Sequence, residues 1–252
     1  MSISIVMMGL LVGFLVGLTG VGGAALLTPV LVLIGIHPSI AIGTDLAYNS
    51  ITKFFGVLQH WRQKTINFSL VKYFSFGSIP SAIIAIVILH LFNFQNRESF
   101  VQHALGYILI IVSLGMFVRI YSEKYLKPSS IQLKPLEQKQ FLTILFGAVF
   151  GFVVGLTSVG SGSLFALAML YFYRLSAVEI VGTDIAHAFL LVTVAGILNA
   201  SYGNVNYSLV MNLLMGSIPG VLLGSALSAK VPTKPLRAIM AIVILISGLK
   251  II

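Results

Sequence analysis

The sequence contains no cysteine, which excludes disulfide bonds, thiolate chemistry and cysteine-ligated metal sites. Charge is also scarce: only 8% of the 252 residues are charged, whereas a soluble domain carries about a quarter. Acidic residues are the rarest charged group, with six in all, and Asp45 and Asp184 are the two aspartates. His-Glu-x-x-His, Walker and dinucleotide-binding patterns are absent as well. We therefore expect no metal centre, no cofactor and no ATP-driven machinery in this chain.

Apolar sequence fills the chain instead. Apolar residues make up 58% of it and the mean hydropathy is +1.05. Crossing a bilayer takes about 20 apolar residues, and stretches of this length occupy nearly the whole sequence. The apolar elements lie at about 3–36, 39–59, 68–92, 99–120, 141–173, 176–200, 205–229 and 235–252. The pattern predicts an all-α polytopic membrane protein with a first repeat at 1–120, a polar cytoplasmic linker at 121–140 and a second repeat at 141–252.

The net charge of +9 does not indicate nucleic-acid binding. The basic residues lie in short loops between apolar spans, which is the positive-inside pattern of membrane proteins. Their expected neighbours are the cytoplasm and anionic lipid headgroups.

Three motifs occur twice in the same order. The segment 13–22 recurs at 151–160, Gly43-Thr44-Asp45 recurs at 182–184, and the Gly-Ser-Ile-Pro segment 77–80 recurs at 216–219. The offset is 138 residues for the first motif and 139 for the others, so most of the chain is an internal duplication. Duplicated halves with a glycine-interrupted apolar segment point to the binding site of a secondary transporter.

The first apolar element of each half is broken by glycine-rich sequence, near residues 19–23 and 157–162. Each arm has about 12–17 residues, too few for a full crossing. We interpret each element as a re-entrant hairpin, followed by three transmembrane helices. Three crossings invert the second half, which places twelve Lys and Arg on the cytoplasmic face and two outside. Full crossings would give nine against five, so the positive-inside rule favours inverted repeats.

The glycine-rich tips are the predicted substrate site. Irregular backbone at membrane depth must be buried or line a cavity, and the N-terminus of the following helix attracts anions. Hairpins that enter from opposite faces would bring the two tips together near the membrane midplane. Close helix packing by small residues is the alternative explanation of the glycines. The predicted substrate-binding residues are Thr19, Gly20, Gly22, Gly23, Thr157, Ser158, Gly160, Ser161 and Gly162, with Ser163 as a further hydroxyl donor.

The two aspartates are predicted to couple transport to a proton or to order the site, since an intramembrane carboxylate is costly. Asn49 and Lys53 follow Asp45 at steps of four residues, and His187 follows Asp184 by three, on the same helix face. A helix-capping role for the aspartates and snorkelling of Lys53 to the interface are the alternatives.

The repeated motifs resemble those of a known family. GLTGVGGAALLTP, followed by GTDLA and GSIP, looks like the sulfite exporter TauE/SafE family, also called the 4-toluene sulfonate uptake permeases. Its glycine-rich motif maps onto Gly20, Gly22, Gly23 and Pro29. In the second half it maps onto Gly160 and Gly162, where Ser161 replaces a glycine and the proline is missing. The resemblance implies a bacterial inner-membrane carrier of sulfite, sulfonates or sulfoacetate, coupled to the proton gradient.

Three other functions fit parts of the sequence. A passive anion channel would share the same tips, and a subunit of a larger assembly would need no transport activity of its own. An intramembrane serine protease would use Ser161 and His187, but Val159 stands where such enzymes have a glycine. We therefore expect a transporter rather than an enzyme.

Overall fold

The computed structural model describes residues 3–19, 24–92, 98–122, 132, 135–228 and 233–252, and every regular element in these ranges is helical. Eight of the helices correspond to the six unbroken apolar elements of the sequence and to the first arms of the two glycine-interrupted elements. In chain order the elements are α1 (Ile3–Thr19), α2 (Ala24–Leu33), α3 (Pro38–Arg62), α4 (Phe68–Leu91), α5 (Glu98–Ser122), the short 3-10 helix η2 (Leu136–Lys139), α7 (Gln140–Thr157), α8 (Leu164–Phe172), α9 (Ala177–Ser201), α10 (Tyr207–Ser228) and α11 (Thr233–Ile251).

The predicted all-α membrane architecture is confirmed. Among the described residues, five helical stretches are long and apolar enough to cross a bilayer. The break predicted in the second half is present, because α7 ends at Thr157 and α8 begins at Leu164, whereas the break predicted in the first half lies outside the described residues. The second arms are short, with 10 residues in α2 and 9 in α8. Neither of these arms can span a bilayer by itself. The prediction that every arm is too short is wrong for the first arm of the second half, because Leu136–Thr157 is one of the five stretches long enough to cross.

Side chains mark several helix starts. Asn67 caps α4 by accepting a hydrogen bond from the backbone N–H of Leu70. Ser176 and Glu179 form a reciprocal capping box at the start of α9. These polar residues end the loops and set where the long apolar helices begin.

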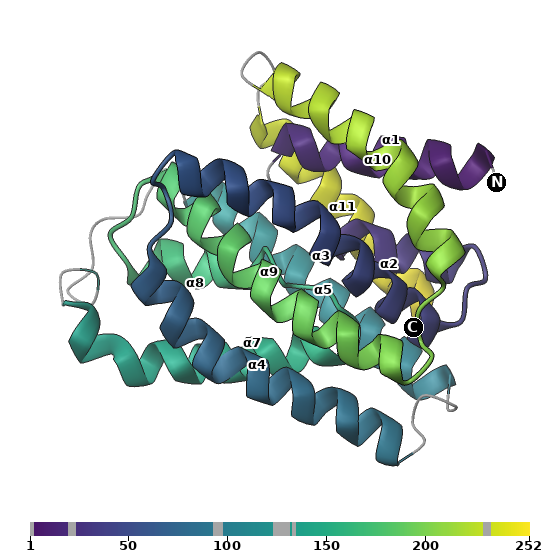
Figure 1. Cartoon of the computed structure of the whole chain (residues 1–252), viewed down its shortest axis with the longest axis horizontal. Helices are drawn as coiled ribbons and strands as arrows, with labels where there is room; N and C mark the ends of the chain where they lie inside the picture. The colour runs from purple at the N-terminus through teal and green to yellow at the C-terminus, as the bar shows by residue number, and fades with distance from the viewer. Residues whose placement is uncertain (1–2, 20–23, 93–97, 123–131, 133–134, 229–232) are drawn as a thin grey trace.

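The two outer helix pairs repeat each other. Figure 1 shows α1 beside α10 on one flank and α4 beside α7 on the other, with α3, α5 and α9 between them. Glycines allow these backbones to approach closely. A Cβ on Gly77 would lie 2.0 Å from the carbonyl oxygen of Ile144, and a Cβ on Gly216 would lie 1.9 Å from that of Val6. The Gly-Ser-Ile-Pro glycines therefore make equivalent contacts in the two pairs.

The central helices α3 and α9 pack antiparallel. Gly43, near the start of α3, lies against Asn199 at the end of α9. Gly182, near the start of α9, lies against His60 at the end of α3. These four positions are themselves related by the 139-residue offset of the duplication, so each half makes the same contact with the other.

Two hydrogen bonds between the halves are also related by the 139-residue offset. The Thr44 hydroxyl accepts from the backbone N–H of Asn206 at 3.1 Å, and the Thr183 hydroxyl accepts from that of Asn67 at 3.0 Å. The threonine of each Gly-Thr-Asp motif thus ties its helix to the loop that precedes α10 or α4.

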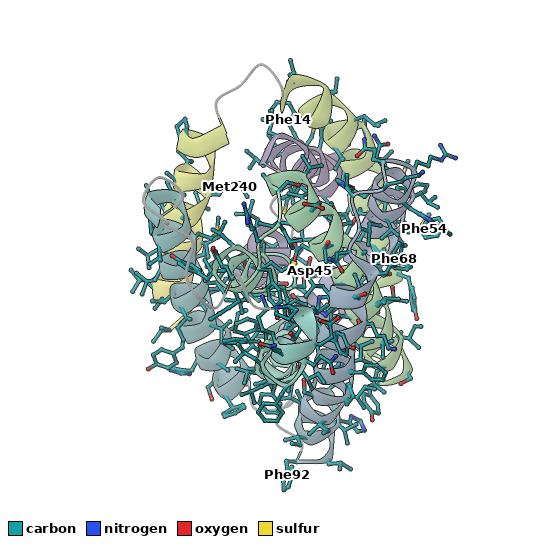
Figure 2. The ribbon with its side chains drawn as sticks, turned by 90° about the vertical axis from the view of Figure 1, so that its left-hand side faces the viewer. Phe14, Asp45, Phe54, Phe68, Phe92 and Met240 are labelled. Carbon is teal, nitrogen blue, oxygen red and sulfur yellow. The ribbon has the colours of Figure 1, made fainter. Side chains whose placement is uncertain are left out.

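The outer surface of the bundle is apolar. Phe54, Phe68 and Phe92 are at least 45% exposed, and Figure 2 shows them at the edge of the molecule. Asp45 lies near the middle in the same view and is fully buried. An apolar exterior around a polar interior is the arrangement that a lipid environment requires.

Candidate functional site

The first glycine-rich tip falls mostly outside the described residues. Gly20, Gly22 and Gly23 lie there, and of Thr19 the structure describes the backbone, at the end of α1. The predictions for these four residues therefore remain predictions. The second tip, between α7 and α8, is described in full.

The second tip reverses the chain with two left-handed residues. After α7 ends at Thr157, Ser158 adopts φ 61° and Gly160 adopts φ 96°. The Ser158 N–H donates to the carbonyl oxygen of Val154 at 2.7 Å, which closes the end of α7. The Gly160 carbonyl then accepts from the N–H of Leu164 at 3.2 Å, which begins α8. Only glycine adopts a φ of 96° without strain, so the turn depends on Gly160.

Asp45 lies against this tip and joins three segments. Its Oδ2 lies at hydrogen-bond distance from the hydroxyl oxygen of Thr28 on α2, at 2.8 Å, and from that of Ser158, at 2.6 Å. The two hydroxyl oxygens are themselves 2.6 Å apart. All three side chains are fully buried. Because Ser158 belongs to the second half of the chain, this cluster locks the second tip onto the first half.

The residues that follow Asp45 on α3 extend the polar cluster. The Asn49 side-chain amide donates to Asp45 Oδ1 at 2.7 Å and to the Asp45 carbonyl oxygen at 2.9 Å. Lys53 is only 7% exposed, so its side chain lies inside the bundle rather than at the membrane surface. It interacts electrostatically with both Asp184 and Asp45. The predicted spacing of four residues therefore brings these three side chains to one buried face.

The second aspartate, on α9, shares Lys53 with Asp45 as an electrostatic partner. Asp184 is 4% exposed, and His187 on the same helix is fully buried. The His187 Nε2 shares a hydrogen bond with the hydroxyl of Ser78 at 2.8 Å, and its ring packs on Phe165 with centroids 4.1 Å apart. Its Nδ1 is buried without a partner among the described residues. His187 thus hydrogen-bonds to Ser78 on α4, and a coupling role for His187 and Asp184 stays a prediction.

Two hydroxyls at the second tip are buried and lack a hydrogen-bond partner among the described residues, those of Ser161 and Ser163. Both precede the first turn of α8. The hydroxyl of Thr157 is instead occupied, because it donates to the carbonyl oxygen of Val153 at 2.8 Å. An unpaired buried hydroxyl is destabilising, so each such group needs an explanation, and a bound ligand is one. Next to the N-terminus of a helix, they can donate hydrogen bonds to an anion.

The surroundings of Ser161 and His187 also bear on the alternative function of an intramembrane serine protease. A serine nucleophile needs a base within hydrogen-bond reach. The Ser161 hydroxyl has no such partner in the described part of the chain, and His187 Nε2 binds Ser78. The described residues also contain no group of three or more His, Cys, Asp or Glu that could hold a metal ion.

Comparison with known proteins assigns the family. A family profile described as "Sulfite exporter TauE/SafE" matches residues 5–251. The chain belongs to the TauE/SafE family. It is 65% identical to the probable membrane transporter protein YjnA of Bacillus subtilis (strain 168), over the full length of both chains. It is also 25% identical to the probable membrane transporter protein YunE of the same organism, over 98% of this chain and 96% of that one. No solved structure matches it significantly.

In this TauE/SafE protein, two polar residues of the site were not predicted from the sequence. Thr28 completes the cluster around Asp45, and Ser78 binds His187. Thr28 lies directly before Pro29 in the glycine-rich opening of the first half, and Ser78 lies in the repeated Gly-Ser-Ile-Pro segment. The signal that could have identified them is a hydroxyl one or two residues before a proline within an apolar span.

Proposed function

We propose that this TauE/SafE membrane transporter is a secondary carrier of small sulfur-containing or organic anions, of the sulfite, sulfonate or sulfoacetate class. The anion would bind at the glycine-rich tips near the membrane midplane, and the proton gradient would drive its movement. The observation that carries this proposal is the unpartnered, buried hydroxyl of Ser161 at the start of α8. The hydroxyl of Ser163 and the nearby helix N-terminus add donors of the kind that bind an oxyanion.

The arrangement of the two halves supports inverted repeats around that site. The equivalent helices α3 and α9 run antiparallel, and the contacts of one outer pair recur in the other. Equivalent helices that run in opposite directions are expected when the second half is inverted. The arms α2 and α8 are too short to span, which supports two hairpins that enter from opposite faces and meet at their tips.

A buried lysine supports an anionic substrate. Lys53 lies in the polar cluster, where Asp45 and Asp184 are its electrostatic partners. Coordination by hydroxyls and backbone N–H groups binds an anion without a fixed bidentate clamp. This suits a carrier, which must also release its cargo. We further propose a location in the bacterial inner membrane with the 121–140 linker on the cytoplasmic side.

The proposal is tested by uptake of radiolabelled sulfite and methanesulfonate into proteoliposomes, with and without an imposed pH gradient. We expect saturable uptake that the gradient drives above equilibrium. Equilibration that neither saturates nor responds to the gradient would identify a passive channel. No flux of either anion would overturn the assignment of the substrate class.

A further inference from the structure

The oxygen atoms of Thr28, Asp45 and Ser158 form a closed triangle. The hydroxyl oxygen of Thr28 lies 2.8 Å from Asp45 Oδ2, the hydroxyl oxygen of Ser158 lies 2.6 Å from Oδ2, and the two hydroxyl oxygens are 2.6 Å apart. Each of these separations is a hydrogen-bond distance for O–H···O. Three contacts of this length therefore need three protons, one between each pair of oxygens.

The two hydroxyls supply only two protons. If Asp45 were ionised, both hydroxyls would donate to it, and the contact between Thr28 and Ser158 would have no proton to stabilise it at 2.6 Å. If Oδ2 carries a proton, the three groups donate in a ring, from Asp45 to Thr28, from Thr28 to Ser158 and from Ser158 back to Asp45. The Asn49 amide donates to Oδ1, which leaves Oδ2 as the protonated oxygen.

We propose that the triangle of Thr28, Asp45 and Ser158 is the proton site of the transporter, and that the proton moves in the same direction as the anion. The location of the proton rests on the triangle alone, whereas the direction rests also on the proposed anion transport. No redox or covalent step is involved: the proton binds Oδ2 from water on one side and leaves to water on the other.

The charges around Asp45 give the direction of coupling. On α3, Lys53 and Tyr48 interact electrostatically with Asp45, and on α9 Asp184 interacts with Lys53 and His187 lies near the same cation. The cluster contributed by α2 and the second tip is made of hydroxyls. If Lys53 and Asp184 are ionised, the form that their mutual attraction favours, then ionising Asp45 as well gives this interior two carboxylates and one ammonium, which repel an incoming anion. With Asp45 neutral, the ammonium balances the remaining carboxylate.

Proton binding therefore favours anion binding, and by linkage the anion favours the proton to the same extent. Such coupling produces cotransport rather than exchange. Protonation of Asp45 also affects how the second tip is held, because Ser158 belongs to the turn before α8 and Thr28 belongs to α2 in the other half. Loss of the proton leaves the Thr28–Ser158 contact unfavourable and releases the tip from α2.

Infrared spectroscopy of the purified full-length protein tests the proton site without any substrate. We expect the spectrum at neutral pH to contain the C=O band of a protonated carboxylic acid that Asp45→Asn removes and Asp184→Asn keeps. Ser158→Gly should shift that band, because it removes one hydrogen bond. Glycine suits this left-handed position, and the equivalent residue in the first half is Gly20. A band lost from the carboxylate region in Asp45→Asn instead would overturn the proposal.

The direction of coupling is tested in proteoliposomes containing a pH-sensitive dye, with an inward gradient of methanesulfonate or sulfoacetate and the membrane voltage clamped. Methanesulfonate does not titrate near neutral pH, so a pH change reports protons moved by the protein. We expect acidification of the lumen that accompanies anion entry, and its loss in Asp45→Asn. Anion entry with alkalinisation or with no pH change overturns cotransport. Failure of both anions to enter would instead overturn the anion assignment, while the infrared result still decides the proton site.

Discussion

Replacement of Ser161 by alanine separates a substrate ligand from a structural residue. The Ser161 side chain is fully buried and its hydroxyl has no hydrogen-bond partner within the described residues. Burying a hydroxyl without a partner costs about 1–3 kcal/mol. Ser161→Ala removes that cost and leaves only a small void. We therefore expect the free energy of unfolding to stay unchanged or to rise, measured by thermal unfolding of the detergent-solubilised protein.

Transport should respond in the opposite direction. A hydrogen bond to a charged group contributes about 1.5–3 kcal/mol, and each 1.4 kcal/mol corresponds to a factor of ten in the dissociation constant. Ser161→Ala should thus weaken anion binding by roughly 10- to 100-fold. The assay is the concentration dependence of methanesulfonate uptake into proteoliposomes, and the change should appear as a higher half-saturation concentration.

A matched control is available on α9. The hydroxyl of Thr193 is also buried without a partner in the described part of the chain, but it is remote in sequence from both tips. Thr193→Val should leave uptake unchanged. If Ser161→Ala lowers stability and leaves the half-saturation concentration unaltered, the reasoning is refuted, and Ser161 has a structural role that the contacts do not show.

Two further substitutions test a contact within the second half and a contact between the halves. Lys139→Met should lower the free energy of unfolding by about 2 kcal/mol, because the Lys139 ammonium donates to the carbonyl oxygen of Phe172 at 3.0 Å, at the end of α8, and thermal unfolding measures the loss. Gly77→Ala should reduce the yield of folded protein in size-exclusion chromatography, since its Cβ would lie 2.0 Å from the carbonyl oxygen of Ile144. Gly115→Ala is the control, because its Cβ would meet no atom closer than 3.7 Å, an ordinary van der Waals contact, and its yield should match the wild type.

The membrane fold could be predicted from sequence because its signals are strong and local. Apolar stretches fix the number and length of the helices, and glycine-rich sequence fixes where two of them break. The ends of α3 and α9 also agree with the predicted elements to within a few residues. Spacing by four residues placed Asn49 beside Asp45, since a helix fixes that geometry wherever it packs.

Contacts between distant segments could not be predicted in the same way. Thr28 and Ser158 are 130 residues apart and meet at Asp45 only through the packing of the two halves. Likewise, His187 shares the helical face of Asp184 but hydrogen-bonds to Ser78, because α4 packs against α9. Helical periodicity says which face a residue occupies, but not which partner that face meets.

The most direct test of the account is a crystal structure of the protein with selenite, a heavier analogue of sulfite whose position anomalous scattering reveals. The account predicts an anomalous peak at the start of α8, within hydrogen-bond distance of the Ser161 hydroxyl, that disappears in Ser161→Ala. A peak bound elsewhere in the bundle, or one that survives the substitution, would contradict the assignment of the glycine-rich tip as the anion site.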